Sequence, residues 1–405
     1  MAAGPAARRR HRRRIVALVG ASASRTAYAL VNARWRQWLG RQPGIEVRDA
    51  ARAIAPGSPP PDYIIHHDYS ERFGEVARPP GGKLIAVRTW DFGPFPPTWV
   101  EKIRGQYDQL WVHSRWVRSQ AIASGVDPRR VRVVPHGVDE RLFRPTGRVA
   151  RLPTPKRFRF IFVGATIVRK GVDVLLAAYR TAFRPEDDVC LVIKDHTGDV
   201  FYSGLSLRAE IQRLAADPRM PAILYIDDYL PAPDLAALYR ACDVAVFPYR
   251  AEGFCLPVLE AMACGVPPIV PRFGPALDYC SSRTAFRIPA RRIRLPMRGR
   301  FAFNTLGFTE DLEGVDFCEV EVGVLAESLR AAYGCPPERL ARMARAGVRV
   351  VRSRFRWRDA AVRIARYLGA LDRDGAGRVR PRPAPGERAR RRAAGSRDWG
   401  HAVGG

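Results

Sequence analysis

The sequence predicts an α/β fold divided into two domains. Short apolar, β-branched runs alternate with amphipathic helical segments, and a strand, loop, helix and strand follow one another between residues 243 and 270. The chain has 405 residues, 47% of them hydrophobic and 27% charged, which is enough for two cores and argues against wholesale disorder. A polar, proline-rich stretch over residues 144–156 is typical of a linker. We therefore expect one domain over residues 15–148 and a second over residues 149–354.

The first domain is expected to begin with a strand over residues 15–20, followed by a small-residue loop and an amphipathic helix. Two further apolar runs, within residues 61–68 and 83–93, each read as a strand that leads into a polar or aromatic loop. In an open parallel sheet such loops lie at the carboxyl ends of the strands, where ligands bind. The loop residues that could contribute to a site are Gly20, His66, His67, Trp90 and Asp91.

The second domain contains the most informative segment, residues 243–270. Residues 243–248 form a short apolar run typical of a buried parallel strand, and residues 249–253 supply the turn after it. Pro257 fits the opening turn of a helix, because its missing N–H would have no partner there, and Gly265 marks the end of that helix.

The start of this helix is suited to an anion. The backbone N–H groups of Phe254, Cys255 and Leu256 are left without helical partners and could meet a diphosphate. Glu252 and Glu260 flank them, and carboxylates accept paired hydrogen bonds from sugar hydroxyls or a ribose diol. The alternative is that both are ordinary acidic residues near a helix start, where the helix dipole favours them.

A second strand, loop and helix occupies residues 158–176. Gly164 permits close approach at the end of the strand, and Asp173 is a plausible cap for the helix. The loop between them carries Arg169 and Lys170, which could pair with phosphate or form a solvated basic pair.

The two segments together resemble the retaining glycosyltransferases called family four, whose mark is two Glu separated by seven residues in a Glu-Gly-Phe-Gly-Leu-Pro setting. Here Cys255 stands where that family usually has Gly. Lys170 aligns with the phosphate-binding Lys of the family, while Ala165 occupies the position of a usual Arg. We infer that Arg169 replaces the missing charge.

The resemblance extends over most of residues 15–370, strongly in the second half. Residues 111–139 resemble the end of the family's first domain, with His136 in place of the usual Asn, and Trp90 stands before Asp91 where members often place a sugar-binding His. A Trp could stack on a sugar face and His66 or His67 could supply a donor, although a buried structural role explains those histidines equally well. The helix at residues 355–371 resembles the terminal helix that packs back on the first domain.

The resemblance implies the arrangement called GT-B, two Rossmann-like domains facing a cleft. It implies a retaining glycosyltransferase of the hexosyltransferase class that moves a sugar from a nucleoside-diphosphate sugar to a saccharide or lipid-linked acceptor. Glu252 and Lys170 are the expected catalytic residues, with Arg169, Gly164, residues 253–256 and Glu260 binding the donor. No metal and no cofactor is then required, because Lys170 and the helix start stabilise the leaving group.

The formal net charge of +28 raises the question of a nucleic-acid partner. Residues 1–14 hold six Arg and no acid, and residues 373–405 hold nine Arg against three acids, so both ends are expected to be disordered basic tails. The rest of the excess is spread evenly, without a nucleic-acid recognition motif. Contact with anionic membrane is a further expectation, because basic segments are attracted to acidic lipid surfaces.

The compartment expected from the sequence is the cytoplasm, with peripheral contact to the inner face of the plasma membrane. No apolar run reaches the ~20 residues that cross a bilayer. Seven Cys without a Cys-x-x-Cys pair favour reduced thiols over a disulfide scaffold. Other function classes stay open: a GT-B epimerase or phosphorylase, a silent sugar-binding protein, and a basic nucleic-acid-binding protein.

Overall fold

The computed structural model describes residues 13–20, 26–49, 57–67, 76–195, 205–297 and 312–376. The described residues up to Arg363 form one compact unit, which holds all the described strands, and the described residues from Ile364 on belong to a second. The predicted tails at residues 1–14 and 373–405 lie outside the described residues, except for 13, 14 and 373–376. In the described part of the chain no helix is both long and apolar enough to cross a bilayer.

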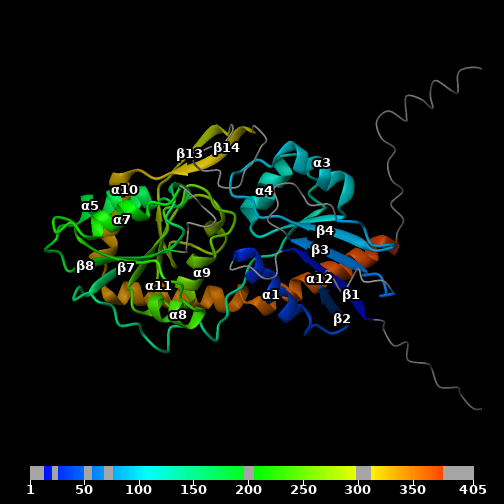
Figure 1. Ribbon diagram of the computed structural model, residues 1–405, viewed down its shortest axis with the longest axis horizontal. Helices are drawn as coiled ribbons and strands as arrows, with labels where there is room; N and C mark the ends of the chain where they lie inside the picture. The colour runs from blue at the N-terminus through cyan, green and yellow to red at the C-terminus, as the bar shows by residue number, and fades with distance from the viewer. Residues whose placement is uncertain are drawn as a thin grey trace, which may run out of the picture. The chain divides into compact units, whose positions relative to one another are not determined.

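The first sheet is parallel and has the strand order β2-β1-β3-β4-β5-β6 (Figure 1). Its buried strands are short and apolar, as expected of strands covered on both faces. The order changes direction between β1 and β3, so the loops after these two strands lie at a topological switch point. The strands are β1 (Arg14–Gly20), β2 (Ile45–Asp49), β3 (Tyr63–His67), β4 (Lys83–Val87), β5 (Gln109–Val112) and β6 (Val131–Val133).

Three described helices accompany this sheet: α1 (Ala27–Leu39), α3 (Pro97–Gln106) and α4 (Arg115–Ala123). Side-chain caps begin two of them, since Thr26 accepts from the amide of Ala29 and Ser114 from the amide of Val117. Aromatic side chains from the loop after β4, those of Trp90, Phe92 and Phe95, fill the core against Trp99 of α3.

The second sheet is also parallel, with the order β12-β11-β10-β7-β8-β9. Numbered within the domain, this is the Rossmann order 3-2-1-4-5-6 read from β9, and its switch point lies between β7 and β10. The strands are β7 (Phe158–Gly164), β8 (Val189–Asp195), β9 (Ala222–Ile226), β10 (Val244–Val246), β11 (Pro268–Pro271) and β12 (Phe286–Ile288).

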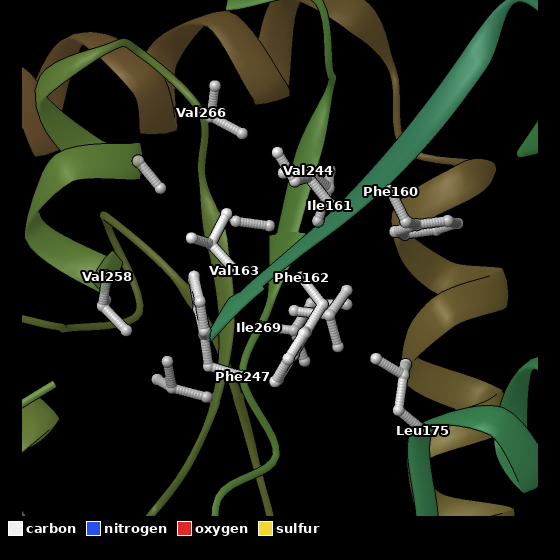
Figure 2. Packing of buried hydrophobic residues seen from close by; sticks show 14 of the residues in the cluster. Phe160, Ile161, Phe162, Val163, Leu175, Val244, Phe247, Val258, Val266 and Ile269 are labelled. Carbon is white, nitrogen blue, oxygen red and sulfur yellow. The ribbon is translucent and has the colours of Figure 1, made fainter. Parts of the chain in front are cut away.

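Helices cover the second sheet on both faces. Side chains alternate along β7, so that Phe160 lies on the side of Leu175 and Val163 on the side of Val258 (Figure 2). The burial of these apolar side chains supplies the main stabilisation of the domain. The described helical segments are η1 (Val168–Lys170), α5 (Val172–Ala182), α7 (Arg208–Ala215), α8 (Ala232–Arg240), α9 (Leu256–Ala263), η2 (Pro275–Asp278), α10 (Val322–Tyr333), α11 (Pro337–Arg354) and α12 (Trp357–Ala376).

The helix predicted around Pro257 is α9, and it begins and ends as expected. Pro257 lies in its first turn, and Gly265 follows its last turn with a left-handed φ of 81°. The cap predicted at Asp173 is wrong: Gly171 occupies the N-cap of α5, and Asp173 lies in the first turn. There its carboxylate accepts two hydrogen bonds from Arg250, at 2.6 and 2.8 Å.

An antiparallel hairpin that the sequence did not predict joins the two domains. It consists of β13 (Arg291–Met297) and β14 (Leu312–Glu319) (Figure 1). The amide of Asp316 donates to the carbonyl of Phe92 in the first domain at 2.8 Å. The amide of Cys318 donates to the carbonyl of Arg250 in the second domain at 2.7 Å. Phe317 packs on Phe92 with ring centroids 5.7 Å apart. Strand β14 therefore bridges the loops that follow β4 and β10.

Candidate active site

The candidate site lies at the switch point of the second sheet, where the loops after β7 and β10 meet. Gly171, at the end of η1, makes this approach possible. Its φ is +75°, and a Cβ placed there would lie 2.0 Å from the carbonyl oxygen of Pro248. Any other residue would clash with the backbone of the β10 loop, so glycine is required to bring the two loops together.

An ion pair joins the loop after β7, which we call the basic loop, to the loop after β10, which we call the acidic loop. The Nζ of Lys170 donates to Oε1 of Glu252, so the two residues expected to be catalytic lie in direct contact. The Glu252 side chain is only 7% exposed, whereas the Lys170 side chain keeps 20% exposure. The ammonium is therefore the more accessible of the two paired charges.

Arg169 lies deeper than Lys170 and has protein partners. Its Nη1 donates to the carbonyl of Ala251 at 2.9 Å and lies 2.9 Å from Oδ2 of Asp91. The Oε1 of Glu252 is 3.9 Å away. The Arg169 side chain is only 7% exposed. It holds the main chain at Ala251, next to Glu252, and it also contacts Asp91 of the first domain. Its inferred role as a phosphate ligand stays a prediction.

The amino terminus of α9 has the geometry of an anion site. Cys255 caps the helix with φ 61° and ψ 64°, the only non-glycine residue with positive φ among those described. The amides of Phe254 and Cys255 donate no hydrogen bond to any described residue. Leu256 opens the helix, where an N–H has no helical acceptor. These amides therefore remain available to bind a ligand oxygen.

Side chains from both domains hold this loop in place. Ser114 donates its hydroxyl hydrogen to the carbonyl of Gly253 at 2.9 Å. The hydroxyl of Tyr279 donates to the carbonyls of Phe254 and Cys255. A Cβ on Gly253 would lie 2.9 Å from Cγ2 of Thr89, so the loop is packed closely against the first domain. These hydrogen bonds fix the main chain of residues 253–255.

Glu260 lies one turn into α9 and is partly exposed. Desolvation raises the pKa of its carboxyl to about 8, and the hydroxyl of Tyr239, 3.4 Å from Oε2, opposes this only weakly. A carboxyl in these surroundings lacks strong donors. It can gain them from the hydroxyls of a bound ribose, which is the contact predicted for it.

The residues predicted for the acceptor side are mostly buried. His66 shares a 2.9 Å hydrogen bond with the hydroxyl of Tyr107, and His67 shares one of 2.7 Å with Oδ1 of Asn32. Trp90 is 3% exposed and donates its indole hydrogen to the carbonyl of Pro94 at 2.8 Å. These contacts assign a packing role to the three side chains and give no support to direct sugar contact.

Gly20 ends β1 at the switch point of the first sheet, and Gly164 ends β7 at that of the second. Their roles in ligand binding stay predictions. Asp91 differs from Trp90 beside it, because its carboxylate leaves the core and meets Arg169.

The sequence did not single out a contact between His113 and His136, which follow β5 and β6. Their ring centroids lie 4.1 Å apart, and His136 packs on Phe254 of the loop after β10 at 4.5 Å. Burial lowers the pKa of His113 to about 4 and that of His136 well below its ordinary value. Both rings are therefore neutral at pH 7 and act as packing between the domains. The available signal in the sequence was a histidine directly after β5 and another three residues after β6.

Within the described ranges, no group of three His, Cys, Asp or Glu side chains has the arrangement of a metal site. The charges gathered at the site are those of Lys170, Arg169, Asp91 and Glu252.

Two parallel sheets of Rossmann type, with the loops after β7 and β10 of the second in contact with the first domain, define the GT-B class of protein. Residues 144–284 match the family described as glycosyl transferases group 1. The predicted fold class and family resemblance are confirmed.

Two curated relatives are named as inositol phosphate glycosyltransferases. D-inositol 3-phosphate glycosyltransferase 1 of Catenulispora acidiphila is 33% identical over 245 residues, which cover 53% of this chain and 57% of that protein. D-inositol 3-phosphate glycosyltransferase of Segniliparus rotundus is 30% identical over 293 residues, covering 68% of this chain and 56% of the relative. The chain thus spans little more than half the length of these relatives.

A solved structure shares the fold across both domains. Alr3699/HepE of Anabaena, crystallised with UDP and glucose, superposes with a TM-score of 0.60 at 15% identity. The match covers 88% of this chain and all of that one. At this identity the likeness concerns the fold alone.

Proposed function

We propose that this protein is a retaining glycosyltransferase, of the hexosyltransferase class, that uses a nucleoside-diphosphate sugar. The observation that carries the proposal is the meeting of Lys170 and Glu252 beside the open amides of α9. One side of this arrangement is positive and suits a diphosphate, and the other is a carboxylate that suits sugar hydroxyls. The group 1 family match over residues 144–284 supports the same chemistry.

The ion pair gives the donor a defined way to bind. The diphosphate competes with Glu252 for Lys170 and accepts hydrogen bonds from Phe254 and Cys255. Glu252, released from Lys170, accepts hydrogen bonds from the hydroxyls of the sugar, while Arg169 holds the main chain of the acidic loop at Ala251. Glu260 takes the ribose hydroxyls. Lys170 and Glu252 thus pair with each other in the empty site and with the donor in the occupied site.

In the reaction, the bond between the anomeric carbon and the diphosphate oxygen breaks, and a bond from that carbon to the acceptor oxygen forms on the same face. The departing oxygen gains negative charge, which Lys170 and the α9 amides stabilise. The acceptor hydroxyl gives its proton to the departing diphosphate. The protein's own residues supply charge and position, and no covalent intermediate is needed.

The acceptor is proposed to be a saccharide or a lipid-linked saccharide, bound on the side of the first domain. Inositol phosphate is one candidate, because two relatives carry D-inositol 3-phosphate in their names. We place the protein in the cytoplasm with peripheral contact to anionic membrane. Seven unpaired cysteines are compatible with a reducing compartment, and the positive net charge favours acidic lipid.

The donor can be identified by thermal unfolding with uridine, guanosine and adenosine diphosphate sugars. A ligand that binds only the folded protein raises the melting temperature, so one base should stabilise it more than the others. Transfer is then measured with that donor and an acceptor panel that includes D-inositol 3-phosphate. Formation of an epimer or a sugar phosphate, with no transfer to any acceptor, would contradict the proposal.

The roles of the ion pair are tested with Glu252→Gln and Lys170→Ala. Each should lower kcat/KM for transfer at least tenfold, because each removes an electrostatic contact with the donor. Binding of the free nucleoside diphosphate should separate them. It should weaken in Lys170→Ala and persist in Glu252→Gln, where Lys170 has lost its competing anion. Unchanged turnover in both variants would exclude this site.

A further inference from the structure

A groove lined by arginines lies on the second domain, away from the Lys170 loop. It has a volume of about 410 Å³ and runs between α11 and the segment that follows η2. None of the residues that line it is acidic, and Met343 and Ala346 form its apolar floor. We call it the arginine groove, and its cations are Arg283, Arg339, Arg342, Arg345 and Arg349.

The geometry of α11 explains how four of these side chains gather. Arg339, Arg342, Arg345 and Arg349 are spaced three or four residues apart, which places them along one face of a helix. They are exposed, while Val348 and other apolar residues of α11 are buried on the opposite face. At 1.5 Å per residue, the row extends for about 15 Å along the helix.

The cations of the arginine groove have no counter-charge close by among the described residues. No described carboxylate lies within 4.0 Å of their guanidinium groups. Elsewhere Arg129 lies 2.8 Å from Asp127, and Arg219 lies 2.9 Å from Asp217. Like charges held this close repel one another, so a bound anion would relieve the repulsion as well as form new contacts.

A second cavity continues the groove and adds an unused donor. It has a volume of about 240 Å³, shares Ser282, Arg339 and Met343 with the first, and adds Arg272 and Arg287. The Nε of Arg287 is buried and has no hydrogen-bond partner among the described residues. A buried donor without an acceptor is costly, and a ligand oxygen would satisfy it.

The shape and lining narrow the class of ligand. Guanidinium groups bind phosphate through paired hydrogen bonds, and Arg is favoured wherever such recognition matters. Phe286 is the one aromatic residue among the lining residues described, and it is only partly exposed, so a platform for stacked bases is lacking. A recess of this size suits a small molecule better than a flat surface. We propose that the arginine groove binds a small, multiply phosphorylated anion.

Inorganic tripolyphosphate is a suitable probe, titrated calorimetrically into the full chain at constant ionic strength. Wild-type protein should bind it, and Arg342→Gln/Arg345→Gln should weaken its binding at least tenfold. Both side chains are exposed, so this variant should fold normally. A matched control, Arg141→Gln/Arg151→Gln, removes two exposed charges outside the groove and should leave the affinity within twofold.

Two further measurements separate this site from other sources of phosphate binding. Lys170→Ala should keep tripolyphosphate binding, since the groove does not depend on the proposed donor site. Vesicles containing phosphatidylglycerol test whether the phosphate belongs to a lipid headgroup. Equal loss in the groove and control variants, loss in Lys170→Ala alone, or binding to vesicles without binding to tripolyphosphate would each overturn the proposal.

Discussion

The Nη1 of Arg169 lies 2.9 Å from Oδ2 of Asp91, and this contact joins the loop after β7 to the loop after β4. Arg169 also donates to the carbonyl of Ala251, the residue before Glu252. One side chain therefore connects the first domain to the acidic loop of the second. Ser114 adds a second connection through the carbonyl of Gly253. The position of Glu252 depends on contacts made by both domains.

Asp91→Asn should destabilise the protein by about 1–3 kcal/mol, because it leaves a buried guanidinium without its carboxylate partner. The free energy of unfolding in urea measures this loss. Asp127→Asn is the control, since it breaks an exposed pair with Arg129, whose side chain is 89% exposed, and should have a much smaller effect. If the two substitutions lowered the free energy of unfolding equally, the buried contact between the domains would contribute no more than an exposed ion pair.

The backbone of Cys255 gives a second prediction. Cys255→Gly and Cys255→Ala both remove the thiol, but only Ala keeps a Cβ at φ 61°. The Gly variant should therefore be more stable by about 1 kcal/mol, the reverse of the usual order in helices. Thermal unfolding of both variants measures the difference.

Cys264 provides the matched control for this comparison. It caps the other end of α9 with an ordinary φ of −77°. There Ala should be more stable than Gly, as in most helical positions. If Ala were also the more stable residue at position 255, the left-handed conformation would carry no strain.

The sequence predicted the second domain better than the first for a physical reason. Pro257 and Gly265 act locally, so the limits of α9 could be inferred from neighbouring residues alone. The burial of His67 could not be inferred in this way, because it depends on partners far away in the chain, such as Asn32 and His113. The pairing of Arg169 with Asp91 spans both domains and has no local signal. The hairpin β13–β14 was missed for the same reason.

Acidic pH should lower the free energy of unfolding, because His113 is buried in its neutral form. Burial lowers its pKa from 6.5 to about 4. Between these values the unfolded chain binds a proton that the folded protein excludes, so the free energy of unfolding falls as the pH drops from 6.5 towards 4. His113→Asn, whose amide can still donate to the carbonyl of Val134, should reduce this slope. Urea unfolding at several pH values measures it, and an identical slope in wild type and variant would contradict the assignment.

Glu260 should lower the free energy of unfolding as the pH rises from 4.5 to 8, which is the opposite of the effect of His113. Its pKa is raised from 4.5 to about 8, so the folded protein keeps a proton that the unfolded chain has lost. The free energy of unfolding then falls as the pH rises through this range and is level above it. Glu260→Gln should remove this fall, whereas Glu338→Gln, an exposed acid on α11, should not.

The same proton links Glu260 to the donor. If ribose hydroxyls donate to its carboxylate, binding favours the ionised form and releases a proton. Affinity for the nucleoside diphosphate should therefore rise between pH 6 and pH 8 in the wild-type protein. In Glu260→Gln it should be weaker, with this part of the pH dependence gone. Calorimetric titrations at pH 6, 7 and 8 measure both effects, and an affinity that rises equally in the two proteins would assign the titrating group elsewhere.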